Sequence, residues 1–146
     1  TGRSRSSAAI INEQKKNTSE GNQTAIEAMH KIKQSAIDTK LALLKGDVGE
    51  FARILGEGWE NKKKMAGAIT NPMIQEAFDV ATGAGAMAGK VSGAGGGGFI
   101  MFVVEPTRKE EVVRALNNLN GFVMPFQFID DGAHGWKIYS TDKVQK

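Results

Sequence analysis

Apolar residues recur at helical spacing through the first half of the sequence. The longest run predicts an amphipathic helix that ends near Gly46, because its apolar residues fall three or four positions apart on one stripe. The residues of that stripe are Ile26, Met29, Ile32, Ala36, Ile37, Leu41 and Leu44. A shorter helix is expected over residues 8–16, with Ser6 or Ser7 as its N-cap.

Two further helices are expected between residues 47 and 82, each with its own start signal. Asp47 is followed three residues later by Glu50, an arrangement similar to a capping box. Asn71 precedes a proline, which is tolerated at the first position of a helix because the missing N–H would have no partner there. The apolar face of the first of these helices comprises Val48, Phe51, Ile54, Leu55 and Trp59.

In the second half, short apolar runs alternate with turn residues. Residues 99–104 predict a buried strand, and a capping box at 107–110 predicts a helix that ends near Gly121. Strands are also expected at 122–129, where Pro125 favours an edge position, and at 136–139. The expected fold class is therefore α+β, with a helical layer that covers a ferredoxin-like antiparallel sheet.

Length and composition narrow the setting. The 146 residues fit one domain, and a start at Thr1 without an apolar leader favours a piece of a larger protein. The sequence has no cysteine and no apolar run of membrane-spanning length, so we expect a cytoplasmic protein with no membrane partner. A net charge of +3 is too small to imply nucleic acid, and the cluster at 62–64 is interpreted as a solvated helix face.

The most unusual stretch lies directly before the strand expected at 99–104. Five of the six residues from Gly93 to Gly98 are glycine. Ordered glycine loses more conformational entropy than other residues, so the cluster needs a structural or functional reason. One hypothesis is a nest of backbone N–H groups that binds phosphate, aided by Ser92 and Lys90; the other is a turn that helps a strand to pack.

Two known phosphate-binding motifs do not fit this stretch. The spacing Gly93-x-Gly95-x-x-Gly98 matches the dinucleotide fingerprint, but that motif requires a helix after the glycines, and a strand is expected here. A Walker A loop ends in Gly-Lys-Ser or Gly-Lys-Thr, whereas Phe99 follows the last glycine. A phosphate nest at the start of a strand and a packing turn remain.

The segment from Lys90 to Gly98, followed by an apolar strand, resembles the third conserved motif of the GHMP small-molecule kinases. This superfamily is named for galactokinase, homoserine kinase, mevalonate kinase and phosphomevalonate kinase. The helices before the motif and the elements after it are similar to its C-terminal domain over nearly the whole chain. Within the superfamily, residues 1–14 and the ending around Phe126 and Trp136 most resemble the D-glycero-D-manno-heptose 7-phosphate kinases.

This resemblance implies transfer of the ATP γ-phosphate to the anomeric hydroxyl of heptose 7-phosphate, for the synthesis of nucleotide-activated heptose. It also implies that ATP and Mg²⁺ are bound mainly by an N-terminal kinase domain, which lies outside this sequence and would be a partner of this chain. Residues 1–146 would then be a C-terminal domain with no catalytic residue and no metal ligand of its own, inactive alone.

The resemblance assigns to this chain one wall of the substrate and phosphate site. The residues expected there are Ser92, Gly93, Ala94, Gly95, Gly96 and Gly97. Ser4 and Arg5 are further candidates, because arginine binds phosphate oxygens through a planar fork; a mobile terminus is the alternative. Phe99 departs from many relatives, which have a small or sulfur-containing residue there, and this affects packing more than chemistry.

Two alternatives stay open. One is another GHMP kinase, of the fucose, galactose or mevalonate type. The other is a ferredoxin-like module that binds RNA or a regulatory ligand, since RNA modules stack bases on exposed aromatic residues of a sheet. We expect no nucleic-acid partner, because the aromatic residues of the apolar runs are expected to be buried and no arginine or lysine is interleaved with them; both tryptophans are assigned to the core. These residues are Phe99, Phe102, Phe122, Phe126 and Phe128, with Trp59 and Trp136.

Overall fold

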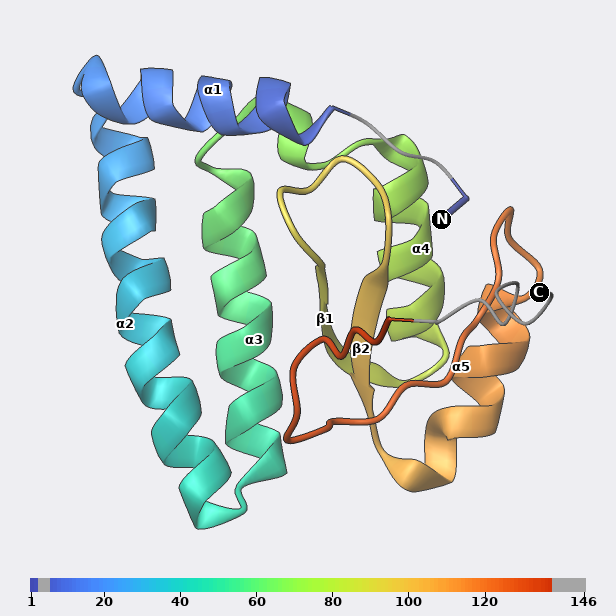
Figure 1. The fold of residues 1–146 in the computed structure, drawn as a ribbon. Helices are drawn as coiled ribbons and strands as arrows, with labels where there is room; N and C mark the ends of the chain where they lie inside the picture. The colour runs from blue at the N-terminus through green and yellow to red at the C-terminus, as the bar shows by residue number, and fades with distance from the viewer. Residues whose placement is uncertain (3–5, 138–146) are drawn as a thin grey trace, which may run out of the picture.

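A computed structural model describes residues 1–2 and 6–137 (Figure 1). The elements in chain order are α1 (Ser7–Ser19), α2 (Gln23–Lys45), α3 (Val48–Lys63), the 3-10 turn η1 (Gly67–Ile69), α4 (Pro72–Gly83), β1 (Ala86–Val91), β2 (Ile100–Val104), the 3-10 turn η2 (Pro106–Arg108) and α5 (Lys109–Leu116). The α+β class and the antiparallel sheet with its helical layer are confirmed. No helix in the described ranges has the length and apolar character needed to cross a bilayer.

Local capping chemistry sets the ends of the central helices as expected. The Asp47 side chain accepts a hydrogen bond from the Glu50 N–H at 2.9 Å, and Asn71 accepts one from Ile74 at 3.0 Å. Gly46 ends α2 with a φ of 68°, a left-handed conformation that glycine adopts without strain. These three helix ends are therefore encoded by a few adjacent residues.

Two other expected caps are not present. Ser6 occupies the N-cap position of α1, but its side chain makes no capping hydrogen bond. The capping box expected at Thr107 is wrong, because Pro106 starts the turn η2, and Thr107 lies inside this turn. As a result α5 begins at Lys109, and it ends at Leu116, before the glycine that was expected to close it.

The antiparallel helices α2 and α3 lie side by side (Figure 1), and α2 turns an unexpected side toward α3. Its buried residues are all small, namely Ala25, Ala28 and Ala42. Most of the apolar stripe predicted from the sequence is instead exposed, including Met29, Ile37, Leu41 and Leu44. Alanine side chains let two helices approach closely, so the helix packs through its small residues although its larger apolar residues share another side.

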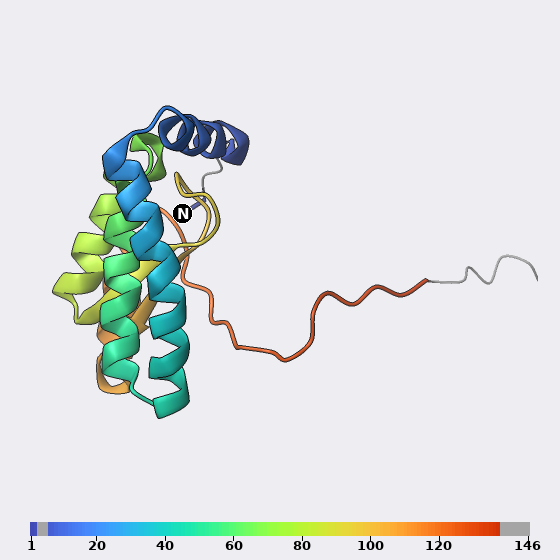
Figure 2. The ribbon, with the colours of Figure 1, turned by 90° about the vertical axis from the view of Figure 1, so that its left-hand side faces the viewer.

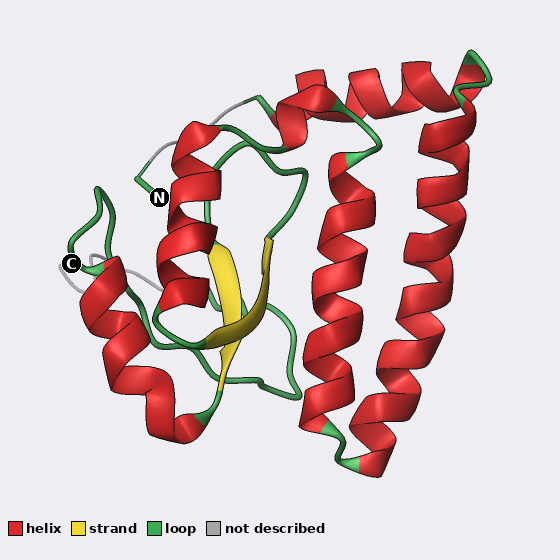
Figure 3. Cartoon of the chain, turned by 180° about the vertical axis from the view of Figure 1, so that it is seen from behind, coloured by secondary structure: helices red, strands yellow, loops and turns green. Residues whose placement is uncertain are grey.

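The sheet is an antiparallel pair of β1 and β2, in which Gly89 pairs with Phe102 and Lys90 with Met101. Strand β1 was not expected, because alanine and glycine are poor strand formers. A Cβ at Gly89 would lie 2.6 Å from Phe102 Cδ1, so the missing side chain makes room for the aromatic ring across the ladder. Figure 3 shows the two strands between α3 on one side and α4 on the other.

The main core cluster lies between α1, α3, α4 and the sheet. Its buried members are Ile10, Trp59, Ala66, Ile69, Ile74 and Val91. The ring of Trp59 stacks on Phe78 with centroids 5.4 Å apart, and Phe78 meets Phe102 edge-on at 5.3 Å. The assignment of Trp59 to the core is confirmed, and Ala94 of the glycine-rich segment packs against this same cluster.

The segment after α5 differs most from expectation. The strand expected at 122–129 does not form; residues 136–137 are not in a strand, and 138–139 lie outside the described residues. Figure 2 shows this segment leaving the helices in an extended conformation; residues 117–137 are called the C-terminal arm below. The strand pattern is present, but no strand among the residues that the structure describes pairs with it, and Pro125 has no N–H to donate to a ladder.

Several aromatic residues of this segment are consequently exposed. Phe122 is 65% exposed, Phe126 59%, Phe128 92% and Trp136 81%, so their expected burial is wrong. Phe99 is also exposed, whereas Phe102 packs against the second core cluster. The argument from buried aromatics against an RNA-binding module therefore does not hold. The geometry of the glycine-rich segment and the comparison with known proteins decide between a kinase domain and such a module.

Candidate functional site

The glycine-rich loop, residues 92–99, connects the two strands and lies close to α1, η1 and the start of α4 (Figure 1). A hydrogen bond from the Ser92 N–H to the Phe99 carbonyl, 2.8 Å long, closes its base. Four of its glycines have positive φ, namely Gly93, Gly95, Gly96 and Gly98. The loop conformation therefore requires glycine, as its sequence indicates.

Gly95 and Gly96 anchor the loop to the protein. The Gly96 N–H donates to the Ile69 carbonyl at 2.7 Å, and the Asn71 side-chain amide donates to the Gly96 carbonyl at 3.0 Å. At Gly95, a Cβ would lie 2.8 Å from the same Ile69 oxygen. The apex of the loop is thus held against η1 and the first turn of α4, as the packing interpretation predicts.

The backbone amides on either side of Gly96 are not used in anchoring the loop. Within residues 1–2 and 6–137, the N–H groups of Gly93, Ala94, Gly95 and Gly97 have no hydrogen-bond partner. Successive unpaired N–H groups in a turn form an electropositive concavity that suits phosphate oxygens. The loop thus combines a rigid anchor with backbone donors that a ligand can use.

Contacts that the sequence did not indicate hold α1 and Thr1 near the loop. Thr1 and Gly98 exchange two hydrogen bonds of 3.0 Å, from the Thr1 nitrogen to the Gly98 carbonyl and from the Gly98 N–H to the Thr1 hydroxyl. Glu13 of α1 accepts from the Gly67 N–H at 2.8 Å. The candidates Ser4 and Arg5 lie outside the described residues, so their role stays a prediction.

Lys62 does not behave as part of a solvated helix face. Its ammonium group donates to the Gly93 carbonyl, and the side chain is half-buried. Burial, with a smaller effect of the charge on Lys90, lowers the pKa of Lys62. Buried Trp59 three residues earlier was the available signal, because residues three apart share one side of a helix. Lys64 is exposed, as expected.

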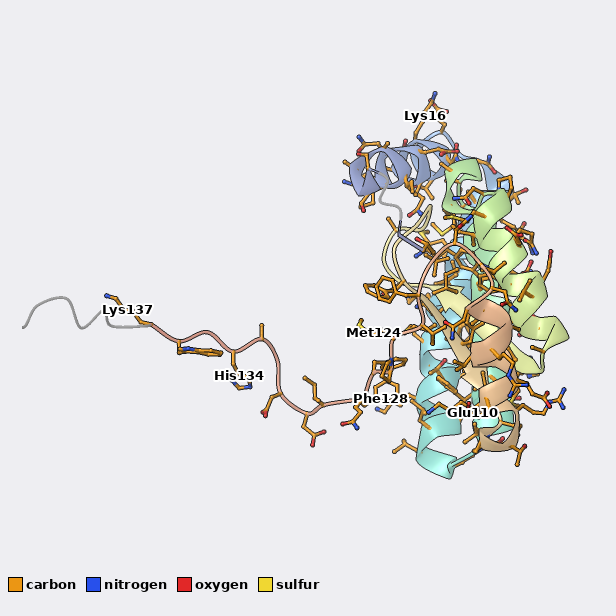
Figure 4. The ribbon with its side chains drawn as sticks, turned by 90° about the vertical axis from the view of Figure 1, so that its right-hand side faces the viewer. Lys16, Glu110, Met124, Phe128, His134 and Lys137 are labelled. Carbon is orange, nitrogen blue, oxygen red and sulfur yellow. The ribbon has the colours of Figure 1, made fainter. Side chains whose placement is uncertain are left out.

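Beyond Ser92 and Phe99 a largely apolar cavity of about 480 Å³ lies between α4, β2 and residues 118–126. Its lining includes Met73, Met101, Phe122 and Met124, and Figure 4 shows Met124 near the body of the molecule. Thr1 also borders it. The cavity therefore joins the glycine loop to the start of the C-terminal arm.

In the described ranges, no three histidine, aspartate or glutamate side chains come together as a metal site. His134 lies on the arm (Figure 4), with its Nε2 atom 3.7 Å from an Asp131 carboxylate oxygen, and both side chains are exposed. The donor groups that the described residues present at the loop include backbone amides and the Lys62 ammonium group, which suit an anion.

Asn71 connects α4 to the loop. Its side-chain oxygen accepts the capping hydrogen bond from the Ile74 N–H, and its side-chain nitrogen donates to the Gly96 carbonyl. We expect Asn71→Asp to keep the cap, since a carboxylate accepts from Ile74 equally well, but to lose the donor to the Gly96 carbonyl. The unfolding free energy of the variant should stay within about 1 kcal/mol of wild type, while the affinity of the loop for inorganic phosphate falls about tenfold because the loop loses this anchor.

The matched control is Asn22→Ala, which removes a cap of α2 away from the loop. This change should cost about 1 kcal/mol in unfolding free energy without reducing the affinity for phosphate. Urea unfolding and calorimetric titration with inorganic phosphate measure the two effects in both variants. Equal effects of both variants on phosphate affinity would contradict a specific role of Asn71 at the loop.

Residues 39–120 match the family described as GHMP kinases C terminal. The chain is 42% identical over 118 residues to the D-glycero-alpha-D-manno-heptose 7-phosphate kinase of Campylobacter jejuni, covering 81% of this chain and 35% of that protein. It is 26% identical over 88 residues to the L-fucokinase/L-fucose-1-P guanylyltransferase of Bacteroides fragilis, covering 60% of this chain and 9% of that one. The chain thus spans about a third of the first relative and about a tenth of the second.

Solved structures agree with this relationship. A sugar kinase structure from Campylobacter jejuni is 43% identical, with a TM-score of 0.58, over 77% of this chain and 34% of that one. The fold is also that of L. major mevalonate kinase, determined in complex with R-mevalonate, with a TM-score of 0.71 at 17% identity over 80% of this chain and 36% of that one. The family match over residues 39–120 includes α3, α4, both strands and the complete glycine loop. The chain belongs to the GHMP kinase family and carries its C-terminal domain.

Proposed function

We propose that this chain is the C-terminal domain of an ATP-dependent kinase that phosphorylates D-glycero-D-manno-heptose 7-phosphate at its anomeric hydroxyl. One observation carries the proposal: an anchored glycine loop with unpaired amides lies in a chain 42% identical to a heptose 7-phosphate kinase. The mevalonate kinase likeness supports the fold alone, and the fucokinase relative is more distant.

In this proposal the loop contributes positioning and charge stabilisation. Phosphoryl transfer depends mostly on holding the reactants in line and on stabilising negative charge at the phosphate oxygens. The N–H groups of Gly93, Ala94, Gly95 and Gly97 donate to these oxygens, and Ser92 offers a hydroxyl at the edge of the loop. The bond between Gly96 and Ile69 keeps these donors in place before a ligand arrives.

Bound ATP would supply the γ-phosphoryl group, with Mg²⁺ neutralising charge on its phosphates. The unpaired loop amides fit the phosphate part of ATP or of the sugar phosphate, whereas the described residues offer no carboxylate cluster for a metal ion. We therefore assign Mg²⁺, most ATP contacts and the catalytic residues to an N-terminal kinase domain, the partner of this chain. A cysteine-free sequence and an ATP-dependent reaction support a cytoplasmic location.

The test is ADP release by the full-length protein with ATP and a panel of acceptors. The panel contains heptose 7-phosphate, the same heptose without its phosphate, fucose, galactose and mevalonate. We expect the highest kcat/KM with heptose 7-phosphate. Turnover confined to fucose, galactose or mevalonate would overturn the substrate and keep a GHMP kinase, whereas salt-dependent RNA binding without turnover would favour a binding module.

A further inference from the structure

Two lysines from different elements converge on one side of the glycine loop. Lys62 ends its side chain at the Gly93 carbonyl, and its ammonium group lies close enough to Lys90 of β1 to feel that charge. Side chains alternate along a strand, so Lys90 and Ser92 lie on the same side of the chain, opposite buried Val91. Lys62, through its bond to the Gly93 carbonyl, and Lys90, two residues before Ser92, therefore lie at the same base of the glycine loop.

Among the described residues, no carboxylate forms an ion pair with either of these two lysines. The adjacent Lys63, by contrast, binds Glu60 at 2.7 Å. Two neighbouring positive charges, one of them half-buried, disfavour each other unless an anion lies between them. A structure that keeps both lysines at this place is consequently suited to a doubly charged ligand group.

Lys62 can bind such a group without releasing the loop. An ammonium group has three donors, and the Gly93 carbonyl uses one of them. The other two remain for ligand oxygens, and the bond to Gly93 fixes where they lie. The position of the loop backbone thus determines where the positive charge of Lys62 lies relative to the ligand.

We propose that Lys62 and Lys90 form a dicationic site for a terminal phosphate group beside the glycine loop. The identity of that phosphate rests on the proposed function: it is either the phosphate that the acceptor sugar already carries or a terminal phosphate of the nucleotide. Both sources present the same chemistry, a phosphate group with about two negative charges, three oxygens and a demand for several donors. The two lysines would then distinguish phosphorylated from unphosphorylated ligands.

The experiment uses the full-length protein with Lys62→Met and Lys90→Met, and Lys64→Met as the matched control from the exposed end of α3. Methionine keeps the length of the side chain and removes its charge. Each test variant should raise the KM of one phosphate-bearing substrate by about tenfold, and the control should stay within about twofold. Lys62→Arg, which keeps the charge, should recover most of the loss caused by Lys62→Met.

The substrate whose KM rises identifies the molecule that carries the bound phosphate. A rise in KM for heptose 7-phosphate alone assigns the site to the phosphate of the sugar, and a rise for ATP alone assigns it to the nucleotide. Unchanged KM values for both substrates, or an equal change in Lys64→Met, would overturn the proposal.

Binding of inorganic phosphate, measured by calorimetry, separates this proposal from the proposed function. If wild type binds phosphate and both methionine variants bind it about tenfold more weakly, the dicationic site stands even where heptose 7-phosphate is not turned over. If wild type and variants bind phosphate equally, or none of them binds it, the site is overturned even where the kinase activity is present.

Discussion

Gly95→Ala is expected to lower kcat/KM of the full-length protein for the proposed reaction by about 100-fold and its unfolding free energy by about 2–4 kcal/mol. Gly95 has a φ of 110°, which a residue with a Cβ rarely adopts, and the added carbon would lie 2.8 Å from the Ile69 carbonyl oxygen. That oxygen also accepts the anchoring hydrogen bond from Gly96. The clash therefore displaces the loop from its support as well as straining it.

Gly93→Ala is the matched control for this prediction. Gly93 also has a positive φ, 75°, but a Cβ there would meet no atom within 4 Å. The control should cost only about 1–2 kcal/mol of backbone strain, with a clearly smaller loss of turnover. Urea unfolding and steady-state kinetics of both variants give the comparison. Similar losses in the two variants would show that close contact with Ile69 does not position the loop.

Trp59→Ala is expected to have the largest effect on stability, a loss of about 3–5 kcal/mol. The side chain is only 3% exposed and stacks on Phe78 in the cluster that supports the glycine loop. Alanine would leave a cavity in this buried cluster, which rigid backbone elements cannot fill. Loss of this support should also reduce kcat/KM, because Ala94 packs on the same cluster.

The second tryptophan provides the control. Trp136 is 81% exposed on the C-terminal arm, so Trp136→Ala should change the unfolding free energy by no more than about 0.5 kcal/mol. Circular dichroism during urea unfolding measures both variants without depending on tryptophan fluorescence. A loss in Trp136→Ala as large as that in Trp59→Ala would mean that the arm packs onto the body.

The helices could be predicted from the sequence because their signals are local. Asp47, Asn71 and Gly46 each define a helix end through hydrogen bonds or backbone conformation within a few residues. Which side of a helix is buried is not local. The predicted stripe of α2 contains Leu41 and Leu44, yet the helix packs through alanines because its partner α3 lies close on that side.

One strand that was not predicted is present, and one that was predicted does not form. Both errors arise because a strand exists only where another strand pairs with it. Strand β1 forms from weak strand residues because Gly89 accommodates the ring of Phe102 on the neighbouring strand. Residues 122–129 have the alternating pattern of a strand, but they pair with nothing in the described structure. Pairing partners are set by the tertiary fold, which residue type and alternation alone do not contain.

The candidate site was only partly accessible from the sequence. The glycine loop was recognisable because five glycines in six residues are costly and because its strand context resembled that of one kinase family. The groups that support it come from distant positions: Ile69 and Asn71 anchor Gly96, and Lys62 reaches Gly93 from the end of α3. No spacing rule connects these residues, since the fold brings them together.

The central claim, that the loop amides hold phosphate, is tested most directly by amide chemical shifts. The full-length protein, labelled with ¹⁵N, is titrated with heptose 7-phosphate and a non-hydrolysable ATP analogue. We predict downfield shifts for the amide protons of Gly93, Ala94, Gly95 and Gly97, and little change for Gly96, which already donates to Ile69. If these four amides keep their ligand-free shifts at saturation, the loop does not bind phosphate and the claim is contradicted.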